Sequence, residues 1–386
     1  MSHLALVTTS FPYGVAGSEA AGSFVADLAE ALAQSCRVTV IAPGLESGQS
    51  NDNAIRVQRF KVPALPLSLL KPLNPLDWKS IFFVIRSGAQ AVRDISQKDK
   101  FDHMLALWAL PSGYWARCAA REQRIPFTVW GLGSDIWSLG RIPIIRGILR
   151  KVLAESHCCF GDGYELAQQM ERIAGRRCEF LASARRLPKV SSRVASRSAP
   201  YTLAFLGRWH VNKGVDLLLE ALKKLDDSCW TQIQEIRICG GGPMERLVAR
   251  EIESLRKLGR PVFQFGFLDK REAAELFQWA DFVLLPSRIE SIPVVFSDAV
   301  HSMRPLISTP VGDLPELMER YRLGVLAQNV TALAYAQAIA KAVTVGPAVF
   351  AERMGEAARV FDIDKIASDL VHKLSLRSEP VRRASL

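Results

Sequence analysis

The sequence lacks most features that mark secreted, metal-binding or membrane-spanning proteins. Its seven cysteines are odd in number and show no CxxC or zinc-finger spacing, which favours reduced thiols over a disulfide framework. Its six histidines show no HExxH-type spacing, so we expect no bound metal. No apolar run approaches the roughly 18 residues that a membrane span needs. The opening residues, MSHLALVTTSFPYG, lack the basic start of a signal peptide. We therefore expect a soluble, cytoplasmic protein.

Acidic residues are fewer than basic residues. The chain has 49 Lys and Arg against 39 Asp and Glu, a net charge of +10. The surplus is concentrated in residues 141–198, where RIPIIRGILRKVL (141–153) alternates basic and apolar residues. Such a pattern is typical of a helix on an anionic membrane surface, and equally of an ordinary amphipathic helix whose basic face is solvated. No recognised nucleic-acid-binding motif accompanies the charge, so we expect no nucleic-acid partner.

Strands and helices alternate along the chain in two blocks, which predicts two α/β domains with parallel sheets. A length of 386 residues agrees with two domains or more. Residues 185–200 are basic, rich in Ser and Pro and without periodicity, as in a linker. The domains are therefore 1–184 and 201–361, followed by a helix and basic tail over 362–386. In such sheets ligands bind beyond the carboxyl ends of the strands, so a cleft between two facing domains is the expected site.

The stretch 280–301 carries the clearest chemical pattern. It predicts a buried strand over 282–285, a polar loop, and a helix entered at Pro293, because Pro suits the first helical position. Glu290 then precedes the helix and Asp298 lies inside it. The helix N-terminus attracts an anion, and carboxylates accept hydrogen bonds from hydroxyls. A nucleotide-sugar, with hydroxyls at both ends and phosphates between, fits this pattern.

Other loops offer groups for the same ligand. Arg208 and Lys213 leave the loop GRWHVNKG together and could neutralise a diphosphate, although surface cations are usually only solvated. The glycines of GGGP (240–243) and of the loop 14–17 could admit a ligand or form plain tight turns. Because GGGP is not a GxGxxG fingerprint, a nicotinamide dehydrogenase is disfavoured.

Two further segments have a polar pattern with open alternatives. In WGLGSDIW (130–137), Asp135 or Ser134 either caps the next segment or points into the expected cleft. DID (362–364) superficially matches a metal-binding DxD, but it lies where an N-cap Asp is expected, so we interpret it as structural. The region 44–77, rich in Pro and Leu, has no pattern that predicts a ligand.

Together these segments resemble the family-4 glycosyltransferases. The resemblance is carried by FLGRWHVNKGVDLLLEAL, ICGGGPMERL, FGFLDKREAAELFQWADFVLLPSRIESIPVVFSDAV and STPVGDLPELM, with ALWALPSGYWA and GLGSDI nearer the N-terminus. It implies a GT-B fold, in which two Rossmann-like domains face each other across a cleft. It also implies a retaining, metal-independent transferase that moves a sugar from a UDP- or GDP-linked donor. The acceptor would be a glycan or lipid-linked molecule of cell-surface polysaccharide synthesis. We further expect peripheral association with the inner face of the cell membrane, and a final helix packed on the N-terminal domain.

The resemblance also assigns roles to residues. Arg208 and Lys213 match the diphosphate-binding pair, and Glu290 matches the carboxylate that holds sugar hydroxyls. Asp298 matches the one that grips the ribose, and Gly17 the loop glycine near the phosphates. A donor phosphate oxygen would take the acceptor's proton, so no side chain need be the base. Further donor contacts are expected from Gly241, Ser291, Pro293, Val294 and Val295, and acceptor or sugar contacts from Asp135 and Trp130.

The sequence departs from the family pattern at three places, of which Asp298 and Leu132 suggest an alternative function. Asp298 stands where the family has a longer glutamate, and Pro293 lies where the family is Gly-rich. Leu132 replaces the family's histidine before GSD. A relative that binds the donor with little catalysis, and regulates or scaffolds a glycan assembly complex, is therefore the alternative.

Overall fold

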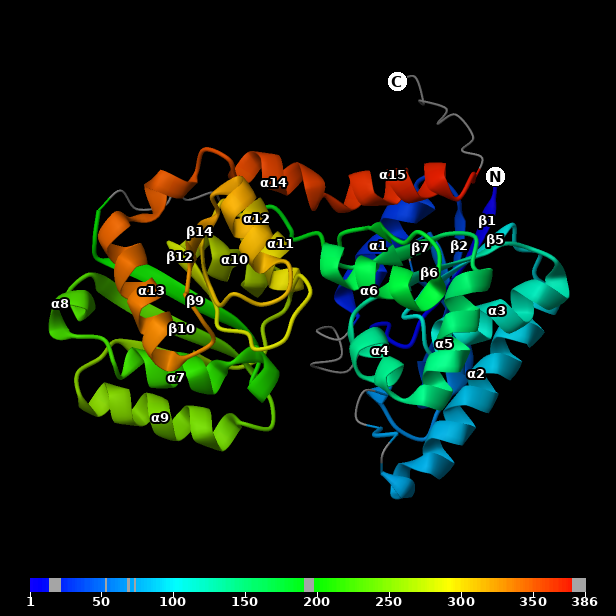
Figure 1. Cartoon of the computed structure of the whole chain (residues 1–386), viewed down its shortest axis with the longest axis horizontal. Coiled ribbons are helices and arrows are strands. Elements are labelled where there is room, and N and C mark those ends of the chain that lie inside the picture. Colours follow the sequence, from blue (N-terminus) through cyan, green and yellow to red (C-terminus); the bar gives the residue numbers. More distant parts are fainter. Residues whose placement is uncertain (14–21, 53, 68–69, 73, 191–197, 377–386) are drawn as a thin grey trace. The chain divides into compact units, whose positions relative to one another are not determined.

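The computed structural model describes residues 1–13, 22–52, 54–67, 70–72, 74–190 and 198–376 (Figure 1). The chain divides into two compact units. Unit 1 comprises Met1–Ala182 together with Ile363–Leu386, and unit 2 comprises Ser183–Asp362. Each unit has its own sheet with helices on both sides (Figure 1). The predicted cleft between the domains stays a prediction.

Unit 1 is built on an eight-stranded sheet with the order β3-β4-β2-β1-β5-β6-β7-β8. Neighbouring strands are parallel, apart from the antiparallel pair β3–β4. The strands are β1 (His3–Val7), β2 (Arg37–Gly44), β3 (Gly48–Asp52), β4 (Ile55–Lys61), β5 (His103–Leu107), β6 (Phe127–Gly131), β7 (Cys159–Gly161) and β8 (Glu179–Phe180). β3 and β4 lie in the region 44–77, where the sequence analysis identified no element.

The helices of unit 1 follow the strands along the chain, and those of eleven residues or more bury one apolar side. They are α1 (Ser23–Ala33), α2 (Trp78–Lys98), α3 (Ser112–Gln123), α4 (Ser134–Trp137), α5 (Pro143–Glu155), α6 (Tyr164–Ala174) and α15 (Ile363–Lys373). The last of these, α15, contacts α1 of the same unit. Its apolar side chains are buried, namely Ile363, Ile366, Ala367, Leu370 and Val371.

Unit 2 contains a six-stranded parallel sheet with the order β11-β10-β9-β12-β13-β14. The strands are β9 (Tyr201–Arg208), β10 (Ile233–Gly241), β11 (Val262–Phe265), β12 (Phe282–Leu285), β13 (Leu306–Ser308) and β14 (Gly324–Leu326). The helices are α7 (Val215–Leu222), α8 (Asp227–Trp230), α9 (Glu245–Lys257), α10 (Lys270–Trp279), α11 (Val294–His301), α12 (Leu314–Tyr321), α13 (Ala332–Val345) and α14 (Met354–Val360).

The stretch around β12 and α11 follows the sequence pattern with one correction. The strand spans Phe282–Leu285 and is fully buried, as predicted. The helix, however, begins at Val294, and Pro293 is its N-cap with an extended backbone. Pro293 is thus not the first helical residue, because its ψ of 143° lies outside the helical region. The loop 286–293 therefore meets the first N–H groups of α11 at the carboxyl end of β12.

Candidate functional site

Two of the predicted site residues meet directly in unit 2. Lys213 ends the short 3₁₀ turn Val211–Lys213 after β9, and Glu290 lies in the loop after β12. Because β9 and β12 are adjacent and parallel, both loops leave the same edge of the sheet. The Lys213 ammonium group forms an ion pair with Glu290 Oε1. Ser287 Oγ also donates to this oxygen, at 3.4 Å.

A second ion pair fixes the two loops against each other. The Arg288 guanidinium donates to both carboxylate oxygens of Asp216, at 2.7 and 2.8 Å. It also donates to the Val211 carbonyl at 2.8 Å, and the Arg288 N–H donates to the Asn212 carbonyl at 2.8 Å. Bidentate guanidinium–carboxylate pairs set geometry as well as energy. Arg288, which the sequence analysis missed, therefore holds the turn of Lys213 beside the loop of Glu290.

Two glycines make this close approach possible. Gly214 has φ +70°, and a Cβ there would lie 1.8 Å from the Pro286 carbonyl oxygen. Gly312, with φ +52°, would place a Cβ 2.2 Å from the Glu290 carbonyl oxygen. Both positions need the left-handed backbone and the missing side chain that glycine provides. The Glu290 loop is thus enclosed on two sides by backbone.

The remaining donor-side residues surround this pair at the same edge. Arg208 ends β9 and is exposed, and Gly241 ends the neighbouring β10, opposite Arg208 in register. A Cβ at Gly241 would lie 2.6 Å from the Phe267 ring, so packing alone requires glycine there. Gly17 lies outside the described residues.

The start of α11 supplies the backbone donors. Val294 and Val295 are its first two residues and are partly exposed, whereas Ser291 and Pro293 are buried. The first N–H groups of a helix have no acceptor within the helix. Val294 and Val295 can therefore donate to a phosphate oxygen, close to Glu290 in the chain.

Asp298 is placed differently from the other predicted donor residues. Its side chain has no exposed surface and pairs with Arg185, whose side chain is 13% exposed. Arg185 Nε lies 2.9 Å from each carboxylate oxygen, and a terminal nitrogen lies 2.6 Å from Oδ2. The resemblance implies that the Asp298 carboxylate binds ribose. In the structure both of its oxygens accept hydrogen bonds from Arg185, a residue of the same unit.

The predicted acceptor-side residues lie in unit 1, where β5 and β6 end. Asp135 is buried, and in the described part of the chain neither it nor Ser134 is a helix N-cap, because Gly133 holds that position in α4. Instead, the Asp135 carboxylate accepts the N–H groups of Ala109 and Leu132. Burial raises the pKa of Asp135 to about 6, despite these bonds, which favour the ionised form. Asp135 therefore joins the two loops.

Trp130 is also fully buried, and its indole nitrogen has no hydrogen-bond partner among the residues that the structure describes. Its ring packs edge-on against Phe24, which also contacts Trp108. Trp108, which follows β5, has φ +68°. Such a backbone is strained for a bulky residue and occurs mostly at functional sites. Trp108 is thus a half-buried residue of this edge that the sequence analysis missed; its motif, ALWALPSGYWA, was the available signal.

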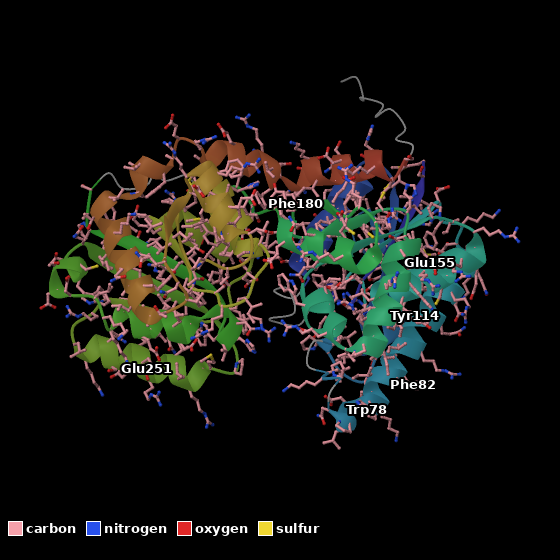
Figure 2. All side chains as sticks on the ribbon, viewed as in Figure 1. Trp78, Phe82, Tyr114, Glu155, Phe180 and Glu251 are labelled. Atoms are coloured by element: carbon pink, nitrogen blue, oxygen red, sulfur yellow. The ribbon has the colours of Figure 1, made fainter. Side chains whose placement is uncertain are left out.

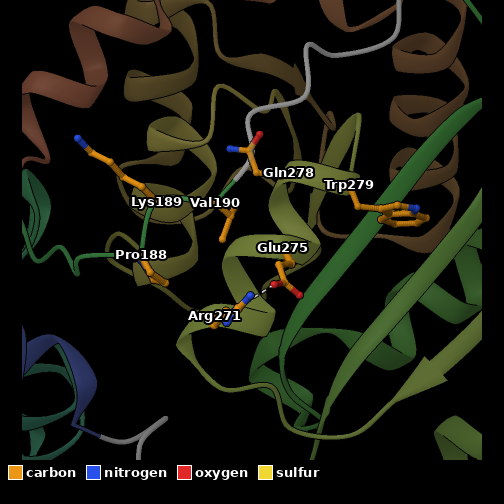
Figure 3. A pocket seen from close by; sticks show the side chains of 7 residues that line it. All are labelled: Pro188, Lys189, Val190, Arg271, Glu275, Gln278 and Trp279. Atoms are coloured by element: carbon orange, nitrogen blue, oxygen red, sulfur yellow. Dashed lines mark hydrogen bonds and ion pairs between the residues drawn. The ribbon is translucent and has the colours of Figure 1, made fainter.

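Three further observations concern the rest of the chain. In unit 2, a pocket of 830 Å³ lies between residues 188–190 and α10, where Arg271 pairs with Glu275 (Figure 3). None of the predicted site residues lines it.

Among the described residues, no three His, Cys, Asp or Glu side chains form a cluster that could hold a metal ion. No helix in that part of the chain has both the length and the apolar character to cross a membrane.

Comparison with known proteins gives a family match within unit 2. Residues 200–344 match the family model described as Glycosyl transferases group 1. D-inositol 3-phosphate glycosyltransferase of Corynebacterium diphtheriae is 32% identical over 141 residues, which are 36% of this chain and 33% of the relative. N-acetyl-alpha-D-glucosaminyl L-malate synthase of Bacillus anthracis is 23% identical over 62% of this chain and 65% of the relative. The matches with these two relatives thus span one third to just under two thirds of their length.

Solved structures match almost the whole chain. Sucrose-phosphate synthase from Thermosynechococcus elongatus superposes with a TM-score of 0.74 at 18% identity, covering 96% of this chain and 98% of the other. Anabaena HepE, solved in complex with UDP and glucose, gives a TM-score of 0.68 at 15% identity, covering 97% and 99%. At these identities the likeness concerns the fold, and it confirms the two Rossmann-like domains of GT-B.

Proposed function

Since the chain has the GT-B fold and its residues 200–344 belong to the group 1 glycosyl transferases, we propose that it transfers a sugar from a nucleotide-sugar donor to an acceptor. The ion pair of Lys213 with Glu290, at the carboxyl edge of the unit 2 sheet, is the observation that carries this proposal. In open α/β sheets this is the edge at which ligands bind. Complexes of HepE with UDP and glucose support a nucleotide-linked donor.

The ion pair has a direct role in donor binding. Without ligand, the Lys213 ammonium group and the Glu290 carboxylate neutralise each other. A donor diphosphate replaces Glu290 as the partner of Lys213, joined by Arg208 and by the N–H groups of Val294 and Val295. Glu290 is then released to accept hydrogen bonds from the sugar hydroxyls. One exchange of partners thus prepares the phosphate and sugar ends of the site together.

The chemistry in this proposal is charge stabilisation. As the bond between sugar and phosphate breaks, negative charge grows on the leaving diphosphate. Lys213, Arg208 and the start of α11 lie where they can stabilise it. A donor phosphate oxygen accepts the acceptor's proton on the leaving-group side, which retains the anomeric configuration. This scheme uses neither a side-chain base nor a metal ion, and no cofactor besides the UDP- or GDP-linked donor.

Unit 1 provides the acceptor side of the proposal. Trp108 lies where β5 ends, beside the buried Trp130, and its half-buried ring offers a face on which a sugar can stack. A polysaccharide acceptor is supported by a relative, TuaC of Bacillus subtilis, which is 23% identical over 66% of this chain and is named for teichuronic acid biosynthesis. Helix α5 exposes Arg146, Arg150 and Lys151 beside Ile144 and Ile148, and Arg141 is exposed just before it. This basic surface suits an anionic inner membrane face.

Release of nucleoside diphosphate tests the proposal. The purified protein is incubated with a panel of UDP- and GDP-sugars and candidate acceptors, beside the variant Glu290→Gln. Release that needs both donor and acceptor, and that falls in the variant, supports transfer. Donor binding without release, detected as a rise in melting temperature, would instead support the binding-only alternative.

A further inference from the structure

The first half of α2 exposes a group of large apolar and basic side chains, here named the α2 patch. The exposed fractions are 60% for Trp78, 66% for Phe82, 48% for Phe83 and 38% for Ile85. Leu76, in the turn just before the helix, is 88% exposed. Figure 2 shows Trp78 and Phe82 at the same end of α2, pointing away from the unit 1 core. Lys79 and Arg86 are also exposed and complete the patch.

The patch is not a loosely attached end of the chain. The opposite side of α2 is buried through Val84, Gly88 and Val92, and α2 packs on α3. A Cβ at Gly88 would lie 2.4 Å from the Trp115 ring, and the Trp115 indole N–H donates to the Ile85 carbonyl at 3.0 Å. Helix α2 is therefore anchored by its inner side while the patch faces outward.

The entry to α2 is equally well held. The Trp78 indole N–H donates to the Pro72 carbonyl at 2.8 Å. The Asp77 carboxylate accepts the Lys71 N–H at 2.9 Å and the Asn74 amide at 3.3 Å. The indole ring of Trp78 is thus oriented by a hydrogen bond and still mostly exposed, which is costly in water unless the ring has a partner outside the chain.

Charge identifies the kind of partner. Trp78, Phe82 and Ile85 recur at helical spacing and form one stripe, and Lys79 and Arg86 lie on the adjacent stripe. From residue 78 to residue 93 the helix contains no acidic residue. Within the described chain, neither Lys79 nor Arg86 is in an ion pair. The patch therefore presents apolar rings beside uncompensated positive charge.

We propose that the α2 patch inserts its apolar side chains into the interface of an anionic lipid bilayer. Trp and Phe partition into the headgroup region, where the ring is half apolar and half hydrated, and each nearby cation adds attraction to anionic lipid. This deepens the membrane contact of the proposed function and rests on it only for the location of the acceptor. It makes α2, rather than the predicted segment 141–153, the inserting element.

Vesicle flotation with the full-length protein tests the inference. Vesicles of phosphatidylcholine with phosphatidylglycerol are compared with phosphatidylcholine alone. We expect the wild type to bind the anionic vesicles, and Phe82→Glu or the pair Lys79→Glu and Arg86→Glu to bind at least about tenfold more weakly. Leu258→Glu, at a residue of unit 2 with 67% exposure, is the matched control and should bind like the wild type. Ile144→Glu tests α5 in the same way and should have the smaller effect.

Trp78 provides a second readout. Anionic vesicles should shift the protein's emission to shorter wavelength, and lipids brominated on the acyl chain should quench it. Trp78→Phe should lose both signals while it still floats with the vesicles. Undiminished binding of the α2 variants, binding that needs no anionic lipid, or no binding by the wild type would overturn the inference.

The two proposals fail separately. Flotation uses neither donor nor acceptor, and nucleoside diphosphate release is measured with a water-soluble acceptor. Phe82→Glu should keep that release, since α2 carries none of the proposed donor-site residues. Release without vesicle binding would overturn the membrane contact alone, whereas vesicle binding without release would overturn sugar transfer alone.

Discussion

At the scale of single residues, the exchange of partners by Lys213 can be tested directly. Lys213→Ala and Glu290→Gln should each lower kcat/KM for the donor by about 100-fold or more, because each removes a charge that orients the donor or stabilises the leaving group. Steady-state release of nucleoside diphosphate measures the effect. Lys223→Ala is the matched control, since Lys223 forms an ion pair with Glu251 elsewhere in unit 2. Near-wild-type kinetics in both site variants would contradict the assignment.

Asp298 leads to a prediction that separates structure from ligand binding. Because its carboxylate is buried and paired with Arg185, Arg185→Met breaks a buried ion pair. We expect a loss of about 3–5 kcal/mol in the free energy of unfolding, measured by chemical denaturation. Asp298→Asn should also be destabilising. If instead Asp298→Asn raised the donor KM and left stability unchanged, the ribose role implied by the resemblance would hold.

These residues show how far sequence patterns reach at this scale. Lys213 and Glu290 could be proposed because each lies in a short loop after an apolar strand. The partner of Asp298 could not, because Arg185 is 113 residues away and lies in a stretch with the composition of a linker. Arg288 was not predicted for a similar reason. An arginine in a polar loop carries no sequence signal that it will pair with a carboxylate 72 residues away.

At the scale of helices and strands, periodicity predicted the strands that bear the site and missed others. The predicted bounds of β12 were correct to the residue, because its four apolar residues lie between polar segments that mark both ends of the strand. β3, GQSND, is exposed throughout and has no apolar alternation, so nothing in its sequence indicated a strand. The α2 patch was missed for a different reason, because composition does not tell which apolar residues of a helix remain exposed.

The loops after β5 and β6 carry a pH-dependent interaction through Asp135. Its folded pKa of about 6 lies above the ordinary 3.8, so folding favours the protonated form. The stabilisation from Asp135 is complete below about pH 4. It is lost as the pH rises through about 6, which lowers the free energy of unfolding by at most about 3 kcal/mol. Denaturation midpoints at several pH values, for the wild type and Asp135→Asn, measure it. The difference between the two should change between pH 4 and 6, whereas a constant difference would contradict the raised pKa.

At the scale of the whole molecule, the last described helix belongs to the unit formed by the first half of the chain. Helix α15 contacts α1, and Lys373 at its end forms an ion pair with Glu179, the first residue of β8. Chain order alone would have placed α15 with unit 2. Two matching α/β units were predictable from the alternation of elements. The packing of the final helix on the N-terminal domain was expected only from the family resemblance, because periodicity does not tell which unit buries its apolar side.

This arrangement predicts where a mutation in α15 is felt. Leu370 has no exposed surface, so Leu370→Ala should cost about 2–5 kcal/mol by leaving a cavity. Hydrogen exchange followed by mass spectrometry should show faster exchange in α1 and β1 of unit 1, and unchanged exchange in β9 and β10 of unit 2, because local stability follows packing rather than chain order. Leu333→Ala, at a residue with 58% exposure in α13, should change neither unit. Faster exchange confined to unit 2 would mean that α15 packs on unit 2, and would contradict its packing on α1.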